Sequence, residues 1–493
     1  MLRTRNPIKP NAVSTQLLRV LIIAVACAAF KAGAQDLPRP VREALRAAGV
    51  PASSVSAWVQ ELGAPRPSVA ARATTPMHPA SVMKLVTTYA ALELLGPAYR
   101  WKTEAYLDGQ DLFLRGYGDP NLNYESFWLL LRHLRERGLR ELHGDVVLDR
   151  SYFGAAQYSP FDSELFRPYN VTPDALLVNF KSLRFTFLPE GEKGVRVFAE
   201  PALPGLEIVN QLKLGDGGCP DGNRAFRDLI QASFQSRPPR ASFIGTYPLS
   251  CGERDLNIAL HDPQDYLAGM IRQLWGEMGG TWSGNVRDGV VPPSARLLYV
   301  HESEPLGDIV RDINKFSNNV MARQLFLTVG AELGGPPARA EEAARAVKEW
   351  VAKKFAAPEL VLENGSGLSR SERITAQHLA ALLAAAWRSP VMPEFVSSLP
   401  VVAADGTMKK RLRGERVAGS AHIKTGLLAD ARAIAGYVLD RNGRRHVVVM
   451  IANHAKAPET DAAMDALLQW VYDSPTAPAR PITNRPGASP PRP

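Results

Sequence analysis

The sequence contains few cysteines and lacks the motifs of several large enzyme classes. Among its 493 residues are three cysteines and nine histidines, and these form no zinc-ligand pattern such as H-E-x-x-H. The phosphate-binding pattern G-x-x-x-x-G-K-S/T and the dinucleotide-binding pattern G-x-G-x-x-G are also absent. A G-x-S-x-G nucleophile elbow is missing too, because ENGSGL has a different spacing. We therefore expect neither a metal ion nor an organic cofactor.

Basic residues exceed acidic residues only mildly. Lysine and arginine number 58 against 49 acidic residues, which gives a formal net charge of +9. No lysine- and arginine-rich block with interleaved aromatic residues marks a nucleic-acid site, so no nucleic-acid partner is expected. The mild excess suits an anionic polymer or, at most, peripheral contact with a membrane surface.

Long apolar runs are lacking, with one exception near the N-terminus. The run VLIIAVACAAF, residues 20–30, follows several basic residues and precedes KAGAQ, in which Ala32 and Ala34 match the pattern that signal peptidase reads. A membrane anchor is the alternative interpretation, but the run is too short to span a bilayer comfortably. Residues 1–34 are therefore predicted to be a signal peptide cleaved after Ala34, and the mature protein to be exported to the periplasm (cell envelope).

Two cysteines remain in the mature chain, Cys219 and Cys251. Both lie in polar segments rich in glycine or proline, GDGGCPDG and YPLSCGERD. In an exported protein such a pair favours one disulfide that closes a loop, and two free buried thiols are the alternative.

The order of periodic segments divides the chain into outer and inner parts. Helix-like and strand-like segments occur near both ends, whereas short strand-like runs separated by Gly, Pro and Asp turns fill the middle. We therefore expect one α/β domain formed by both ends, with a β-rich insert looping out of it. The predicted boundaries are 35–100 and 294–473 for the outer domain, 101–181 and 255–293 for the insert, and 182–254 for a nested β-rich unit that holds the cysteine pair. The Pro-rich residues 474–493 are predicted to form a disordered tail.

The stretch HPASVMKLVTTYAALELLGP, residues 78–97, places a serine and a lysine at the start of a predicted helix. Ser81 and Lys84 are spaced i, i+3 and would share one helix face. An amine there can accept the proton of the hydroxyl if burial and neighbouring cations lower the pKa of the amine. The alternative is a serine that caps the helix and a lysine exposed to solvent, and the pair alone favours that simpler interpretation.

Two further polar motifs lie in the C-terminal half. The triplet SNN, residues 317–319, stands between apolar residues inside a predicted helical segment, a setting that favours a site over bulk water. The triplet KTG, residues 424–426, lies on a predicted strand, where lysine and threonine can bind a carboxylate and glycine lets another backbone approach closely. Polar triplets in helices are usually exposed turns or loop ends, and KTG taken alone is better explained as an ordinary strand end with a turn glycine.

The combination of the three motifs is more specific than its parts. Ser-x-x-Lys, Ser-x-Asn and Lys-Thr-Gly occur in the order and on the elements that are typical of penicillin-recognising serine enzymes. Four more segments, LFLRGYGDPNL, ENGSGLSRSERIT, SLPVVAADGTMKKRL and IKTGLLADARAIAGYV, and the large insert complete a resemblance. The chain resembles the penicillin-binding protein 4 type of D-alanyl-D-alanine carboxypeptidase/endopeptidase, the class C low-molecular-mass penicillin-binding proteins, over nearly all of the mature chain. This implies an α/β (α+β) penicillin-binding/serine β-lactamase-like transpeptidase domain with a large β-rich insert of one or two small domains.

The resemblance also implies a catalytic role for each motif. Ser81 would attack the D-Ala-D-Ala carbonyl and form an acyl-enzyme, with Lys84 as general base. Ser317 would relay a proton to the leaving amine, and Asn319 would position Lys84 and the substrate amide. Water would then hydrolyse the ester.

Substrate binding is implied for the KTG strand. Lys424 and Thr425 would bind the terminal carboxylate of the substrate or of a penicillin, with Gly426 beside them, and Lys424 also belongs to the catalytic set. The backbone N–H groups of the nucleophile and of Leu427 would form the oxyanion hole. Leucine at 427 and 428 departs from the small or hydroxylated residues frequent in the family, which puts a side-chain contact to the carboxylate in doubt.

The segment FDSELFRPYN and Arg370 provide further candidate contacts. Glu164, and after it Asp162, is the candidate acid near Tyr169 that would bind the free amine of the substrate side chain. Arg370, beside GSGLS, is a candidate for binding a second carboxylate. Solvated acids in a loop are the alternative interpretation.

The leading hypothesis is a serine DD-peptidase that acts on peptidoglycan stem peptides and binds β-lactam antibiotics. A β-lactamase or esterase of the same fold is a second hypothesis, which the large insert and the lack of an assignable deacylating glutamate disfavour. A non-catalytic peptidoglycan-binding relative is a third, which the intact motifs disfavour. Carboxypeptidase and endopeptidase activity, and the oligomeric state, stay open at this point.

Overall fold

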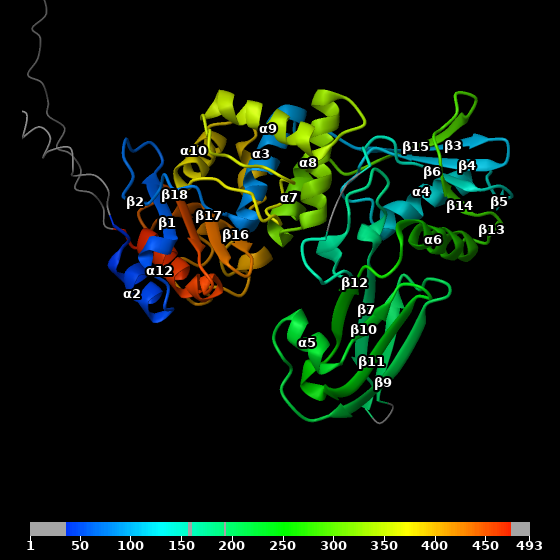
Figure 1. Cartoon of the computed structure of the whole chain (residues 1–493), viewed down its shortest axis with the longest axis horizontal. Coiled ribbons are helices and arrows are strands. Elements are labelled where there is room, and N and C mark those ends of the chain that lie inside the picture. Colours follow the sequence, from blue (N-terminus) through cyan, green and yellow to red (C-terminus); the bar gives the residue numbers. More distant parts are fainter. Residues whose placement is uncertain (1–35, 156–159, 192–193, 475–493) are drawn as a thin grey trace, which may run out of the picture.

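The described part of the chain comprises residues 36–155, 160–191 and 194–474 of a computed structural model. The predicted signal peptide and the predicted tail, apart from Ser474, lie outside these residues. Within them, no helix combines the length and the apolar character needed to cross a bilayer. Figure 1 shows a sheet with helices on both faces, a second sheet at a distance from it, and a smaller β-rich region beside the second sheet.

Both ends of the described chain contribute strands to one five-stranded sheet. Its order is β16-β17-β18-β1-β2, and each neighbouring pair is antiparallel. The strands are β1 (Val55–Glu61), β2 (Val69–Ala71), β16 (Ala421–Leu427), β17 (Ala431–Leu439) and β18 (Arg445–Asn453). The outer parts of the chain therefore meet in one sheet, and the KTG triplet lies on its edge strand β16.

Burial on both faces of this sheet explains the uninterrupted apolar run of β18. Val447, Val449 and Ile451 belong to the hydrophobic cluster of one face, whereas Val448 and Met450 belong to that of the other. Two helices, α2 (Arg39–Ala47) and α12 (Asp461–Tyr472), contribute to the second cluster. The first cluster includes six helices: α3 (Lys84–Leu95), α7 (Leu306–Phe316), α8 (Asn319–Gly334), α9 (Ala340–Lys354), α10 (Ala376–Trp387) and α11 (Met392–Ser397).

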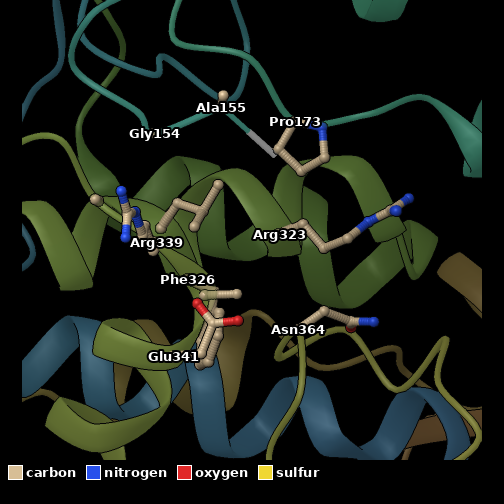
Figure 2. Close-up of a pocket in the computed structure, with 11 residues that line it drawn as sticks. Gly154, Ala155, Pro173, Arg323, Phe326, Arg339, Glu341 and Asn364 are labelled. Atoms are coloured by element: carbon tan, nitrogen blue, oxygen red, sulfur yellow. The ribbon is translucent and has the colours of Figure 1, made fainter. Parts of the chain in front are cut away.

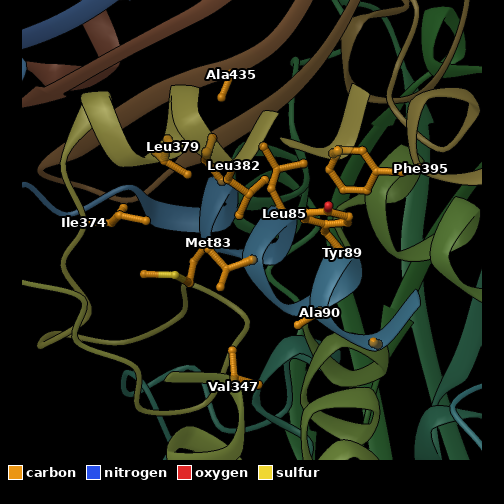
Figure 3. Close-up of a cluster of buried hydrophobic side chains, with 14 of the residues drawn as sticks. Met83, Leu85, Tyr89, Ala90, Val347, Ile374, Leu379, Leu382, Phe395 and Ala435 are labelled. Carbon is orange, nitrogen blue, oxygen red and sulfur yellow. The ribbon is translucent and has the colours of Figure 1, made fainter. Parts of the chain in front are cut away.

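Helix α3 is buried on nearly all sides in the middle of the helical layer. Leu85 and Tyr89 of α3 belong to one hydrophobic cluster with Val347 of α9, Leu382 of α10 and Phe395 of α11 (Figure 3). Burying a side chain of this size contributes roughly 1.5–3 kcal/mol each. The start of α3, which carries Lys84, is therefore fixed by the core of the protein.

The insert is organised around a second five-stranded sheet of order β14-β6-β4-β3-β15. Its strands are β3 (Lys102–Asp108), β4 (Asp111–Gly116), β6 (Val146–Asp149), β14 (Val286–Asp288) and β15 (Arg296–Glu302). The associated elements are α4 (Tyr124–Glu136), α6 (Pro263–Glu277) and the short pair β5 (Glu141–Leu142) and β13 (Thr281–Trp282). Because β15 pairs with β3, this sheet continues past the boundary expected at residue 293.

The nested unit contains two three-stranded sheets, β12-β7-β8 and β10-β11-β9. Its elements are β7 (Leu183–Pro189), β8 (Val195–Glu200), β9 (Glu207–Gly215), α5 (Asn223–Leu229), β10 (Ser233–Gln235), β11 (Arg240–Pro248) and β12 (Arg254–Ile258). Strand β12 runs past the expected end at residue 254, and the nested unit shares one hydrophobic cluster with the insert. Cys219 and Cys251 form a disulfide in this unit, with a sequence separation of 32 residues.

Removing this disulfide is expected to destabilise the nested unit. Closing a loop of this length reduces the entropy of the unfolded chain, which corresponds to about 3–4 kcal/mol. The variant C219A/C251A should therefore have a lower midpoint of thermal unfolding than the wild type and be cleaved faster by a protease between the two positions. Equal unfolding midpoints for the variant and the oxidised wild type would contradict this expectation.

Candidate active site

Ser81 lies in a tight turn that leads into α3. The turn is a 3-10 helix, Ala80–Met83, and α3 follows directly at Lys84. Ala80 has φ of +47°, a left-handed conformation that costs free energy for a residue with a side chain. His78 stabilises this turn, because its Nδ1 accepts the Ala80 N–H at 3.0 Å and its Nε2 donates to the Ser369 carbonyl at 2.9 Å. The backbone around the candidate nucleophile is therefore held in a conformation that it would not adopt alone.

Lys84 is fully buried and contacts the candidate nucleophile. Its Nζ lies 3.0 Å from Ser81 Oγ, 2.5 Å from Asn319 Oδ1 and 2.5 Å from the Ser366 carbonyl oxygen. A neutral amine has two N–H donors and one lone pair, and the amide oxygen and the carbonyl oxygen can only accept. With both N–H groups engaged there, the lone pair points to the Ser81 hydroxyl, which is the geometry that a general base needs.

Burial and positive neighbours favour the neutral form of this amine. Burial lowers the pKa of Lys84 well below its usual value, and the nearby charges of Lys424 and Arg323 lower it further, whereas Glu372 raises it. Burial also lowers the pKa of Lys424, to about 7. Lys84 is therefore not the solvent-exposed lysine of the alternative interpretation. Its lowered pKa meets the condition for accepting the Ser81 proton.

The SNN triplet lies at a junction between two helices, whereas the sequence pattern predicted a position inside one helical segment. Helix α7 ends at Phe316, and Ser317 adopts a left-handed conformation with φ of +56°. Asn318 caps the next helix by accepting the N–H groups of residues 320 and 321, and Asn319 begins α8. At this junction Ser317 Oγ lies 2.8 Å from Lys424 Nζ, and Asn319 contacts Lys84.

The KTG strand completes the site from the edge of the central sheet. Lys424 is fully buried and donates to Ser317 Oγ and, at 2.7 Å, to the Thr425 carbonyl. Thr425 donates its hydroxyl proton to Thr407 Oγ1 at 2.8 Å. A Cβ atom at Gly426 would lie 2.5 Å from the Pro79 carbonyl oxygen, so only glycine lets the strand pack against the turn that carries the nucleophile. Leu427 follows with a side chain that is 55% exposed.

A loop between α9 and α10 forms part of the site that the motifs did not predict. This loop, residues 363–371, supplies the Ser366 carbonyl to Lys84, and Gly367 packs so tightly that a Cβ atom would lie 1.9 Å from the Ala80 carbonyl oxygen. Buried Glu372 follows the loop and binds its backbone. The segment ENGSGLSRSERIT contributed to the family resemblance, but nothing in the local pattern indicated a contact through a carbonyl group.

The insert acids differ in their surroundings. Asp162 accepts hydrogen bonds from the Tyr169 hydroxyl at 3.0 Å and from the Asn170 side chain at 2.8 Å. Glu164 instead forms an ion pair of 2.5 Å with Arg227 in the nested unit. The guanidinium of Arg370 lies 4.2 Å from the ring centre of Phe161, next to Asp162. Of the two acids, Asp162 is the one that contacts the aromatic residue Tyr169, whereas Glu164 is paired with Arg227.

One of the cavities is lined by residues of the SNN triplet. A groove of about 700 Å³ begins at residues 317–319 and continues along Tyr169 to Arg184 and Asn257 of the nested unit. A second cavity, of about 560 Å³, is lined by Arg323 of α8 and by Asn364 (Figure 2). Arg323 is buried, donates to the Asn319 and Tyr169 carbonyl groups, and has its pKa lowered by burial to about 9.

The assembled groups have the parts that acyl transfer requires. A hydroxyl lies against a buried amine with a free lone pair, and a second hydroxyl lies against a second buried amine. The members of these two pairs come from three separate parts of the sequence. They lie in one site because Asn319 of the SNN triplet contacts Lys84 and strand β16 packs against the turn that carries the nucleophile. Such a site can attack a carbonyl carbon, protonate a leaving amine and bind a carboxylate.

Comparisons with known proteins cover most of the chain. A D-alanyl-D-alanine carboxypeptidase of Actinomadura sp. (strain R39) is 28% identical over 422 residues, which cover 79% of this chain and 76% of the relative. The D-alanyl-D-alanine carboxypeptidase DacB of Haemophilus influenzae is 24% identical over 396 residues, which cover 77% of this chain and 81% of the relative. The crystal structure of penicillin binding protein 4 from Haemophilus influenzae superposes with a TM-score of 0.70 at 21% identity, over 88% of this chain and 99% of that one, so the predicted fold is confirmed. Residues 40–473 match the model of the D-Ala-D-Ala carboxypeptidase 3 (S13) family, and the chain belongs to that family.

Proposed function

We propose that the protein is a serine DD-peptidase that cleaves D-Ala-D-Ala bonds in peptidoglycan peptides. The observation that carries this proposal is that Lys84 Nζ donates to Asn319 Oδ1 and to the Ser366 carbonyl. These two hydrogen bonds leave the lone pair of the neutral amine for the Ser81 hydroxyl. Ser81 Oγ attacks the carbonyl carbon while its proton passes to Lys84. The oxyanion receives backbone N–H groups of Ser81 and Leu427.

Collapse of the tetrahedral intermediate requires a proton for the leaving amine. Ser317 relays to the leaving amine the proton that Lys84 took from Ser81, which makes Lys84 neutral again, and the Lys424 ammonium at 2.8 Å holds Ser317 Oγ in place by donating a hydrogen bond to it. Water then attacks the ester, with Lys84 again accepting a proton. Lys84 therefore acts as a base in both half-reactions.

Charged and polar groups around the nucleophile suit the ends of the substrate. Lys424 and Thr425 bind the terminal carboxylate, and Thr407 orients the Thr425 hydroxyl through their contact of 2.8 Å. We assign the amine of the substrate side chain to Asp162, with Tyr169 beside it, because Glu164 is engaged by Arg227. Arg370 is the candidate for a second carboxylate. A β-lactam places its carboxylate and its reactive carbonyl in the same relation, so it would acylate Ser81.

The groove that begins at Ser317 supports action on cross-linked peptides as well. Because Ser317 serves the leaving amine, this groove of about 700 Å³ opens on the leaving-group side of the scissile bond. A released D-alanine would leave most of it empty, whereas a second stem peptide attached through the leaving amine would extend along it towards Asn257. We therefore propose endopeptidase activity in addition to carboxypeptidase activity.

The cellular setting and the domain division follow from the same proposal. Residues 1–34 act as a signal peptide, and the disulfide between Cys219 and Cys251 suits an oxidising compartment such as the periplasm. The catalytic domain comprises both ends of the chain, and the sheet pairing supports assigning β15 to the insert.

Substitution of the nucleophile gives the most direct test. Ser81→Ala should abolish covalent labelling by a fluorescent penicillin and release of D-alanine from a pentapeptide, because among the described residues no other hydroxyl contacts the side-chain amine of Lys84. The unfolding midpoint should change little. Labelling that persists in folded S81A would refute the assignment, and rapid turnover of penicillin by the wild type would favour a β-lactamase instead.

The pH dependence of acylation should be bell-shaped. Measured as the second-order rate constant for penicillin labelling, the rate rises as pH increases and Lys84 loses its proton, because only the neutral amine is a base. The rate falls again above about 7, where free Lys424 loses the charge that binds the carboxylate of penicillin. A rate that keeps rising to pH 10 would contradict the role of Lys424.

Blocking the groove should separate the two activities. Asn257→Trp places a large ring in the groove and should slow cleavage of a cross-linked peptide dimer by about tenfold, which corresponds to about 1.4 kcal/mol. Penicillin labelling and pentapeptide cleavage should stay at wild-type rates, since both ligands end near Ser317. Lys213→Trp, at an exposed position of β9 outside the groove, is the matched control. Equal losses for dimer and pentapeptide would contradict a leaving-group subsite.

A further inference from the structure

A buried carboxylate beside the site has no role in the mechanism above. Glu372 is fully buried, and its Oε1 accepts the backbone N–H groups of Glu363 at 3.2 Å, Asn364 at 3.0 Å and Gly365 at 2.9 Å. Its Oε2 has no hydrogen-bond partner within the described ranges. Burying a carboxylate that contacts no cation is costly, so this position needs a physical reason.

The three N–H groups belong to the start of the loop that orients Lys84. Ser366, the next residue, supplies the carbonyl oxygen 2.5 Å from Lys84 Nζ. Gly365 is held by Thr87, which donates its hydroxyl proton to the Gly365 carbonyl at 2.6 Å. Gly367 is wedged against the Ala80 carbonyl on the other side. A displacement at the carboxylate is therefore transmitted directly to an acceptor that directs the lone pair of Lys84.

Glu372 also supplies negative charge to a cationic site. The charged groups acting on Lys84 come from three elements: Lys424 on β16, Arg323 on α8 and Glu372 ahead of α10. The two cations lower the pKa of Lys84, whereas the carboxylate raises it. Burial raises the pKa of Glu372 above its ordinary value, and its N–H donors and Lys84 oppose that rise.

Two other titratable groups contact the loop from its outer side. His78 donates to the Ser369 carbonyl, and burial lowers the pKa of His78. The exposed carboxylate of Glu363 accepts hydrogen bonds from the hydroxyl groups of Ser369 and Ser371. Glu363 thus holds the same loop as Glu372 but is absent from the charges that act on Lys84, which makes it a matched comparison.

We propose that Glu372 is a positioning residue for Lys84, which it serves by fixing the loop that presents the Ser366 carbonyl and by placing a negative charge beside a site that otherwise holds cations. This inference rests on the proposed roles of Ser81 and Lys84. It assigns two separable tasks to the Glu372 side chain. Its length, or reach, lets Oε1 accept the three loop N–H groups, and its negative charge raises the pKa of the Lys84 amine.

Substitution by glutamine tests the charge. Glu372→Gln keeps the length and one acceptor oxygen but removes the negative charge, so the pKa of Lys84 falls and the neutral amine persists to lower pH. The measurement is the rate constant of penicillin labelling as a function of pH in the full-length mature protein. The midpoint of the acidic limb should move to lower pH by about one unit. Glu363→Gln should keep the midpoint of the wild type.

Substitution by aspartate tests the reach and remains informative if E372Q does not fold. Glu372→Asp keeps the charge but withdraws the oxygen from the three N–H groups, so the maximal rate should fall by about 10- to 100-fold with an unchanged midpoint. An E372Q midpoint equal to that of the wild type, or an E372D maximal rate equal to that of the wild type, would overturn the proposal. Absence of labelling in the wild type would instead refute the proposed function itself.

Discussion

Burial of Lys84 is the constraint on which the site depends. An ammonium group taken fully out of water is unstable unless its protons and charge are compensated, and here the neighbouring cations Lys424 and Arg323 act against the charge. The protein therefore favours the neutral amine, and Asn319 and the Ser366 carbonyl decide where its lone pair points. A lysine of ordinary exposure in the same sequence motif would hold its proton at neutral pH and leave Ser81 an inert hydroxyl.

The fold brings three distant segments within contact of this amine by close backbone packing. Gly367 and Gly426 both lie where a side chain would collide with the carbonyl groups of residues 79 and 80. The left-handed conformations of Ala80 and Ser317 each cost of order 1–3 kcal/mol. Packing of α3 on all sides offsets this cost, because the buried cluster leaves the start of the helix no alternative position.

Periodicity and motif order predicted much of this arrangement. They did not predict the contacts that backbone groups make in the site. The helix that starts at the Ser-x-x-Lys pair was predicted from the sequence and is present as α3, because helix signals are local properties of the chain. The sequence placed the end of the insert at residue 293, whereas β15 extends the insert sheet beyond it. Its pairing with β3 joins residues far apart in the chain and leaves no local signal. The SNN triplet was predicted inside a helix because apolar residues flank it closely, whereas the left-handed conformation of Ser317 ends α7 there. Ser366 and Glu372 act through a carbonyl group and through backbone N–H groups, for which the sequence carries no side-chain signature.

The central claim is that Lys84 is a neutral amine at physiological pH, and its titration can be observed directly. In the mature protein labelled with carbon-13 at lysine Cε, the Lys84 signal is assigned by its loss in the folded variant Lys84→Arg. The account predicts a titration midpoint well below the usual lysine pKa of about 10.4, while exposed lysines titrate near that value. A Lys84 midpoint indistinguishable from that of the exposed lysines would contradict the account.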